Sequence, residues 1–209
     1  FLGVNALAGV GSTGSVNFLI NGFCMGVCTG FAIPVAQRFG AEDEKGLRRY
    51  VGNSIWRSAV FAVIMTVIVS VFCREILILM QTPADIIDDA YAYIFIIFVG
   101  IPVTYLYNLT SGIIRSLGDS KTPVYFLLMA SALNIVLDIL FITQFDSGVA
   151  GAAYATVISQ LVSGIACLIF MAKKFPILRL ERDDLRPRKP CMMTLCSMGV
   201  PMGLQYSIT

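Results

Sequence analysis

The stretch PVYFLLMASALNIVLDILFITQF, residues 123–145, decides the fold class of this chain. Among its 23 residues there is one charged side chain, that of Asp138. A helix needs about 20 predominantly apolar residues to cross the hydrocarbon core of a bilayer. The stretch therefore predicts a membrane-spanning helix, and it places a carboxylate where water is scarce.

Four further segments have the same length and the same apolar character. We expect spanning helices over 14–36, 55–80, 91–114 and 149–172, and the start of a sixth near residue 191. These runs do not alternate as the strands of a membrane barrel do, and a helix satisfies its own backbone hydrogen bonds in lipid. Only 13 % of the residues are charged, against about 25 % in soluble domains. The prediction is an all-α, polytopic transmembrane bundle of five full spans and a truncated sixth.

Basic residues alternate between the connections of this bundle. Fourteen of the 15 Lys and Arg residues fall within 38–57, 115–121 and 173–189. Because basic loops stay on the cytoplasmic side, these connections are expected in the cytoplasm. The connections 74–90 and 145–149 are then expected outside.

The longest polar stretch, KKFPILRLERDDLRPRKP at 173–190, divides the chain. We interpret it as a cytoplasmic linker between a helical lobe at 1–172 and the start of a second lobe at 191–209. Membrane topology alone explains its seven basic residues, although binding to anionic lipid headgroups would also use them. Both termini lie in apolar segments, so we interpret the chain as a piece of a longer membrane protein.

The segment 14–36 carries glycines at every fourth position, Gly22, Gly26 and Gly30. This spacing lets a neighbouring helix approach closely, so we predict a packing face. Asn17 and Asn21 share another face, where they either pack or point into a cavity.

Two other spans each carry a polar stripe. In 91–114, Thr104 and Asn108 lie four residues apart, after Pro102, which is expected to kink the helix. In 149–172, Thr156 and Gln160 have the same spacing. Such stripes line a cavity or form hydrogen bonds between helices, and the sequence leaves both open.

The span 123–145 carries Ser131, Asn134 and Asp138 on one stripe. A charged Asp inside a membrane costs at least ~2.5–3.5 kcal/mol on insertion scales. An intramembrane acid is by default a functional residue, and the alternative is a carboxylate satisfied by neighbouring donors. If the stripes turn inward, the bundle encloses a polar cavity that contains one acid.

Several function classes find no support in the sequence. There is no histidine, the six cysteines contain no CxxC pair, and a net charge of +2 is too small to argue for nucleic acid. No nucleophile–base pair, metal cluster or glycine-rich phosphate loop is present. We therefore expect neither an enzyme, nor a cofactor, nor a nucleic-acid partner.

Four motifs together resemble the multidrug and toxic-compound extrusion (MATE) family. They are PVAQRFGAEDEKGLRR at 34–49, GIIRSLGDSKTP at 112–123, NIVLDILFI at 134–142 and GVAGAAYATVISQ at 148–160. The resemblance implies a twelve-helix fold in two lobes, of which this chain holds helices two to six, the linker and the start of helix seven. Residues 1–13 would be the external end of the first connection, and the missing first helix and carboxy-terminal lobe would be partners of the chain.

The resemblance also implies a function. Family members exchange Na⁺ or H⁺ for organic compounds, often amphiphilic cations, which implies a multi-pass protein of the cell membrane, here the bacterial inner membrane. Asn134 and Asp138 match the fifth-helix residues of the family's cation site, Thr156 matches a sixth-helix ligand, and Asn108 is a weaker match. Their oxygens suit Na⁺ as a hard cation, whereas a proton needs the carboxylate alone.

The predicted site has two parts. Asp138, Asn134 and Thr156 form the cation site, and the substrate cavity is expected to contain Thr104, Asn108, Ser131 and Gln160. Two alternatives remain, a lipid-linked oligosaccharide flippase of the same superfamily and a membrane subunit without transport. No Lys or Arg lies in the middle of a span to hold a phosphate, which favours the drug exporter. A lone acid beside an aligned Asn and Ser is not needed by a purely structural subunit.

Overall fold

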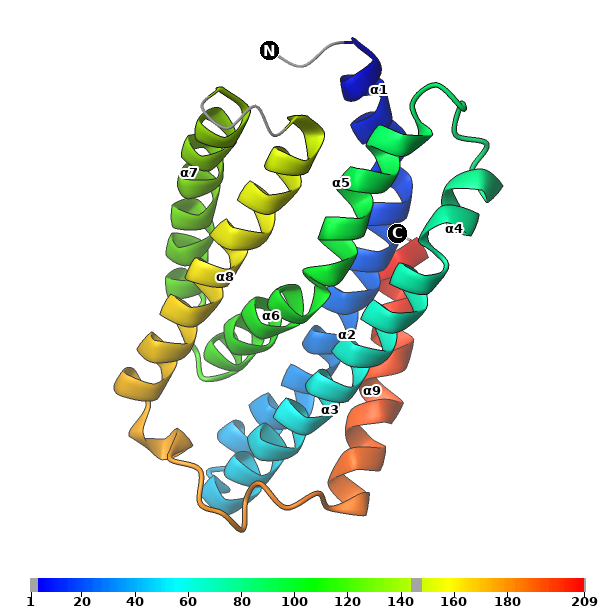
Figure 1. The fold of residues 1–209 in the computed structure, drawn as a ribbon. Coiled ribbons are helices and arrows are strands. Elements are labelled where there is room, and N and C mark those ends of the chain that lie inside the picture. The colour runs from blue at the N-terminus through cyan, green and yellow to red at the C-terminus, as the bar shows by residue number, and fades with distance from the viewer. Residues whose placement is uncertain (1–3, 144–147, 209) are drawn as a thin grey trace.

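The computed structural model describes residues 4–143 and 148–208, and every regular element in them is a helix (Figure 1). The predicted all-α transmembrane bundle is confirmed. The elements are α1 (Val4–Ser12), α2 (Gly14–Gly40), α3 (Glu44–Val71), α4 (Cys73–Leu79), α5 (Ile87–Val99), α6 (Ile101–Ser116), α7 (Lys121–Thr143), α8 (Gly148–Lys174), the 3₁₀ turn η1 (Pro176–Leu178) and α9 (Lys189–Ile208).

Four of these helices are long and apolar enough to cross a membrane, and a fifth span exists if α5 and α6 count as one. Helix α3 begins at Glu44, earlier than the predicted start at residue 55. The side chain of Asp43 caps it by accepting a hydrogen bond from the Gly46 amide at 2.9 Å. The prediction counted only the apolar part, whereas the helix also runs through the charged segment that is expected to be cytoplasmic.

The span predicted over 91–114 is broken into α5 and α6, which meet at an angle of 45°. The break lies at Gly100, and Pro102 occupies the first turn of α6. Proline has no amide hydrogen to bond the preceding turn, which makes it a helix starter. A side chain at Gly100 would collide with Val157 of α8, so glycine also permits close packing at the bend.

Residues 1–13 were expected to be a connection, but Val4–Ser12 forms the short helix α1. The segment of this helix contains neither proline nor charge to interrupt it. The hydroxyls of Ser12 and Thr13 donate to the Gly9 and Val10 carbonyls and mark the break before α2.

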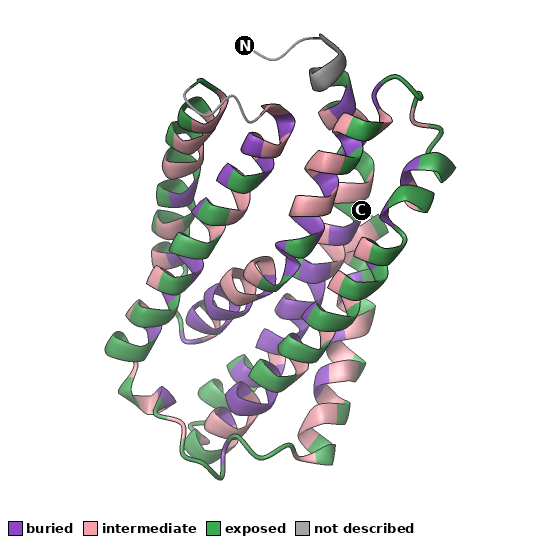
Figure 2. Cartoon of the chain, in the orientation of Figure 1, coloured by how far each residue is buried: buried purple, intermediate pink, exposed green. Residues whose placement is uncertain are grey.

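Helix α2 is the centre of the bundle, packed against α9, α6 and α3, whereas α7 lies at the periphery beside α8 (Figures 1 and 2). The core is formed by buried residues such as Val27 and Phe31 of α2, and Phe98 and Ile113 of the α5–α6 pair. The α2–α3 turn and the linker lie at the end expected to be cytoplasmic, and the α4–α5 loop lies at the opposite end. Most of the connection 145–149 falls on residues 144–147, outside the described residues.

Candidate functional site

A cavity of about 600 Å³ lies between α2, α6, α8 and α9, with one residue of α7 at its edge. Its polar lining consists of carboxamides and hydroxyls, with aromatic and aliphatic side chains beside them, and none of the described lining residues is charged. The lining residues are Gly14, Asn17, Phe18, Asn21, Gly22, Met25, Thr104, Tyr107, Asn108, Leu127, Gln160 and Tyr206.

Three predicted cavity residues come together here. The Thr104 hydroxyl of α6 donates to the Gln160 side-chain oxygen of α8 at 3.0 Å. The Asn108 amide donates to the Thr104 carbonyl at 2.9 Å, one turn back along α6. The sequence left open whether these polar stripes line a cavity or form hydrogen bonds between helices. They do both, because Thr104 bonds Gln160 across two helices and both residues also line the cavity.

Helices α2 and α9 supply the remaining polar wall. Asn21 donates to Asn17 through their side chains, and both line the cavity. Tyr206 of α9 lies across from them, and sequence reasoning missed it. No local pattern marks this tyrosine, because only the long-range packing of α9 on α2 brings it to the cavity.

The predicted cation residues lie together, but outside the cavity lining. The Asn134 amide of α7 donates to the Thr156 hydroxyl of α8 at 3.4 Å, and that hydroxyl donates to the Ala152 carbonyl at 3.0 Å. Asp138 lies one turn further along α7. Oxygen Oδ1 of Asp138 is enclosed and has no hydrogen-bond partner in the part of the chain that the structure describes.

The two groups of residues are neighbours along α8. Thr156 belongs to the Asp138 group and Gln160 to the cavity, and they lie four residues apart, about 6 Å or one turn along α8. Ser131, expected in the cavity, is not among the lining residues; its side chain is exposed and its hydroxyl donates to the Leu127 carbonyl of its own helix.

The glycines of α2 form a close contact with α9. A Cβ atom on Gly22, Gly26 or Gly30 would lie less than 3 Å from the α9 backbone. On the α9 side of this contact, Gly199 packs against Phe31 and Gly203 packs against Val27. We call this contact the glycine seam. It closes one side of the cavity, because Gly22 and Tyr206 belong both to the seam and to the cavity lining.

The MatE family model matches residues 1–140 of the chain. This chain is a member of the MatE family. It is 33 % identical, over 98 % of its length, to "Probable multidrug resistance protein YoeA" of Bacillus subtilis. It is 26 % identical, over 96 % of its length, to "Probable multidrug resistance protein NorM" of Thermotoga maritima. The chain covers 46 % and 44 % of these two proteins, about half of their length.

Solved structures of MATE family transporters superpose on nearly the whole chain. An outward-facing multidrug resistance MATE family transporter of the MOP superfamily matches with a TM-score of 0.90 and 27 % identity, over 98 % of this chain and 46 % of that one. An inward-facing structure titled in the same way gives 0.89 and 26 %, over 98 % and 47 %. The chain is therefore a multi-pass membrane protein with the fold of one half of a MATE transporter.

Proposed function

We propose that this chain is part of a secondary antiporter, located in a bacterial inner membrane, that exports organic compounds in exchange for Na⁺ or H⁺. One observation carries the proposal: the Oδ1 atom of Asp138 is enclosed and has no partner among the described residues, and Thr156 of the same group lies one helical turn along α8 from Gln160 in an uncharged, amide-lined cavity. The relatives that carry the words multidrug resistance in their names support an organic substrate.

The residues present suit either coupling ion. A sodium ion would be held by the Asp138 carboxylate, the Asn134 side-chain carbonyl and the Thr156 hydroxyl, all hard oxygen ligands. A proton would bind to Asp138 alone, because a medium of low dielectric disfavours the charged carboxylate. In both cases the ion satisfies the Oδ1 atom that has no hydrogen-bond partner among the described residues.

The cavity suits amphiphilic compounds. Phe18, Tyr107 and Tyr206 supply aromatic rings, which attract organic cations through their faces. Carboxamides such as Asn108 donate and accept hydrogen bonds and do not commit the cavity to one substrate. The lining contains no described Lys or Arg to hold a phosphate, and the flippase alternative is not favoured.

Coupling between ion and substrate requires that they favour different conformations of the transporter. Helix α8 connects the two groups of residues, because Thr156 bonds Asn134 and Gln160 bonds Thr104. A change in the occupancy of the Asp138 group would shift α8 relative to α7. The same shift would alter the Thr104–Gln160 bond in the cavity wall.

The test is the substitution Asp138→Asn in the complete transporter, reconstituted in liposomes. It keeps the size and hydrogen-bonding capacity of the side chain and removes its charge. We expect normal membrane levels and no ethidium transport driven by an imposed Na⁺ or H⁺ gradient. Ser131→Ala, which removes an exposed hydroxyl from the same helix, is the control and should transport normally. Uphill transport by the Asp138→Asn protein would exclude the proposal.

A further inference from the structure

We propose that the cytoplasmic end of α3 and the linker bound to it form a binding surface for anionic phospholipid headgroups of the inner leaflet. We call this surface, residues 44–57 and 179–189, the headgroup platform. It is separate from the cavity and from the Asp138 group, and the proposal does not depend on the transported substrate.

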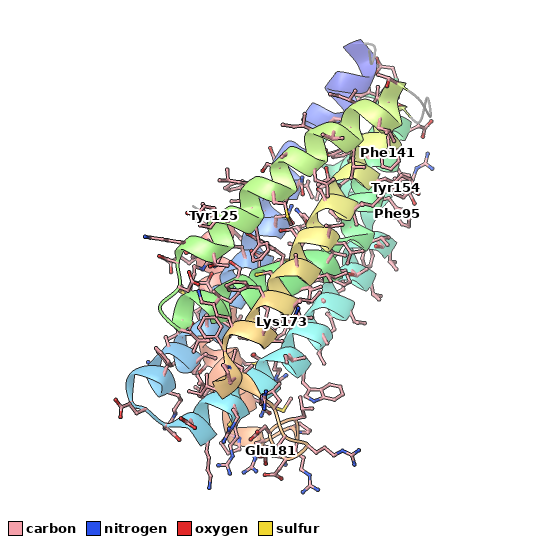
Figure 3. All side chains as sticks on the ribbon, turned by 90° about the vertical axis from the view of Figure 1, so that its left-hand side faces the viewer. Phe95, Tyr125, Phe141, Tyr154, Lys173 and Glu181 are labelled. Atoms are coloured by element: carbon pink, nitrogen blue, oxygen red, sulfur yellow. The ribbon has the colours of Figure 1, made fainter. Side chains whose placement is uncertain are left out.

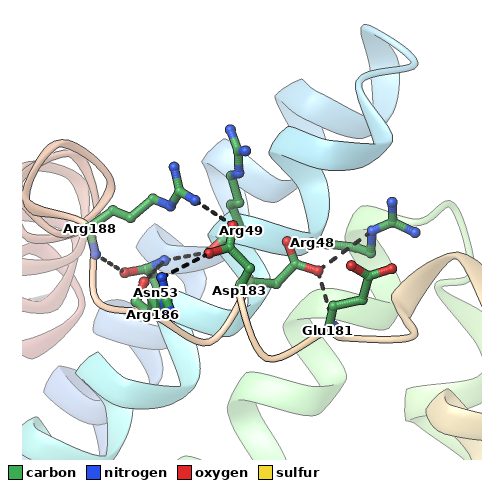
Figure 4. A network of polar contacts seen from close by, with 8 residues as sticks. Arg48, Arg49, Asn53, Glu181, Asp183, Arg186 and Arg188 are labelled. Carbon is green, nitrogen blue, oxygen red and sulfur yellow. Dashed lines mark hydrogen bonds and ion pairs between the residues drawn. The ribbon is translucent and has the colours of Figure 1, made fainter.

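The platform is a fixed structure, because α3 holds the linker backbone (Figure 4). The fully buried Asn53 accepts a hydrogen bond from the Arg188 amide at 2.9 Å and donates to the Arg49 carbonyl at 2.8 Å. The Trp56 indole donates to the Leu185 carbonyl at 2.8 Å. A Cβ atom on Gly52 would collide with the Asp184 carbonyl, so the linker lies as close to α3 as a glycine allows.

Two acidic side chains of the linker, Asp183 and Asp184, form ion pairs with arginines of the platform. Asp184, which is 8 % exposed, pairs with Arg48 at 3.8 Å and accepts a hydrogen bond from the Glu181 amide at 3.1 Å. Asp183 pairs with Arg188 at 2.8 Å and with Arg186 at 3.6 Å. These two acids therefore hold the platform together and neutralise only part of its charge.

The remaining charge is positive. The platform contains nine basic and four acidic residues, a net charge of +5, whereas the whole chain has +2. The Nε atoms of Arg49 and Arg57 are enclosed and lack a hydrogen-bond partner in the described part of the chain. Both residues are otherwise partly exposed and pair with no acidic side chain in the described part of the chain, so the outer ends of their guanidinium groups can bind an additional acceptor.

The platform lies at the depth of the lipid headgroups. Exposed apolar side chains on α3 begin at Ile55 and Trp56 and continue towards Val71, which marks the lipid-facing part of the helix. Arg49 and Arg57 lie on either side of this start, about 12 Å apart along the helix axis. Trp56 is 50 % exposed between them, and tryptophan is enriched where membrane meets water.

The chemistry of the two free guanidinium groups indicates a phosphodiester. Arginine donates in a planar fork that matches a phosphate better than the point charge of lysine does. Basic clusters beside a spanning helix attract anionic lipids through the negative potential of the cytoplasmic leaflet. Topology accounts for the number of basic residues here, but it does not account for a fixed linker beside two partly exposed arginines that have no acidic partner among the described residues.

The experiment is native mass spectrometry of the complete protein in detergent, titrated with phosphatidylglycerol or with the zwitterionic phosphatidylcholine. Removing the two guanidinium groups by Arg49→Gln with Arg57→Gln should lower phosphatidylglycerol binding by about 10- to 30-fold. The binding of phosphatidylcholine should not change. The control removes two cytoplasmic charges outside the platform, by Arg38→Gln with Arg115→Gln, and should keep the preference for phosphatidylglycerol.

Each other outcome overturns the proposal. An equal loss in the platform variant and in the control would show attraction by net charge alone. Equal binding of the two lipids by the unmodified protein would show no headgroup recognition. Full competition by inorganic phosphate at matched concentration would indicate a site for a soluble anion. If the glutamine variant does not fold, Arg49→Lys with Arg57→Lys replaces it, and unchanged selectivity in that variant would exclude recognition by the arginine fork.

Discussion

The pair α2–α9 and the pair α7–α8 are packed in opposite ways. Helix α2 buries ten of its 27 residues, and its backbone touches that of α9 at three glycines. Helix α7 buries only Pro123 and Ala130 among its 23 residues, and it lies mainly against α8. Figure 3 views the molecule from the side of α7 and α8, with Tyr125 on the outer helix α7.

The more apolar helix of the two is the less buried one. The central stretch of α7 is more apolar than that of α2, yet α2 is the centre of the bundle. In a membrane, a high mean hydropathy indicates a helix that contacts lipid, since lipid tails are as apolar as leucine. A helix that is buried among other helices is indicated instead by small residues at a helical spacing, as at Gly22, Gly26 and Gly30.

The strongest test of this comparison is Gly26→Leu in the glycine seam. A side chain there would meet the backbone of Met202 and Gly203, which cannot rotate away. Overpacking costs about 1–3 kcal/mol and sometimes more, and we expect the upper end and a clearly lower unfolding temperature. Gly40→Leu on the same helix is the control, because nothing lies within 4 Å of a Cβ at that position. Equal unfolding temperatures for the two variants would show that the seam does not carry the packing.

Ser163→Ala probes the α7–α8 pair with a smaller expected effect. The buried Ser163 hydroxyl donates to the Phe126 carbonyl of α7 at 2.8 Å. Hydrogen bonds between membrane helices are worth about 0.6 kcal/mol on average, so a shift of that size in the free energy of unfolding is expected. The measurement is steric trapping or denaturant unfolding in micelles. A loss as large as that of Gly26→Leu would contradict the view that α7 is loosely held.

The last test concerns the base of the α7–α8 pair, beside the turn between α6 and α7. The Lys174 ammonium donates to Asp119 at 2.8 Å, and the Thr122 amide and hydroxyl donate at 3.0 and 2.7 Å, which together hold the Asp119 pKa well below its usual range. Because the Asp119 pKa is lower in the folded state than in the unfolded state, the ionised carboxylate stabilises the fold at a pH above the unfolded-state pKa. This contribution is lost as the pH falls through the folded-state pKa. An exposed pair of this kind is worth less than about 1 kcal/mol.

Asp119→Asn should therefore lower the unfolding temperature slightly and by a constant amount between pH 5 and about pH 8. The difference from the unmodified protein should shrink only below about pH 4, where the unfolded aspartate takes up its proton. A difference that changes across the neutral range would mean that Asp119 titrates there, and the assigned contacts would then be wrong. Thermal unfolding across this pH range is the measurement.

The sequence predicted what depends on local length and spacing. The spans were visible from apolar runs such as 123–145, since the bilayer sets how long a run must be. The break at Gly100 was placed two residues late, at Pro102, because the collision that requires a glycine comes from Val157 on another helix. Thr104 and Gln160 were found separately, and their hydrogen bond depends on how α6 and α8 are brought together.

The remaining part of the candidate site depends on packing over long separations. Tyr206 reaches the cavity only because α9 folds back onto α2. The separation of Asp138 from the cavity follows from the position of α7, which contributes Leu127 to the lining but not Asp138. The spacing of residues within one helix does not predict which helices pack together.

The glycine seam also has a consequence for biosynthesis. Gly30 of α2 meets Gly199 of α9, which lies far along the chain. At about 5–20 residues per second, the ribosome completes α9 roughly 10 to 30 seconds after α2. During that interval the glycine face of α2 is inserted without its partner, and the central contact of the bundle forms only after every other spanning helix of this chain has been made.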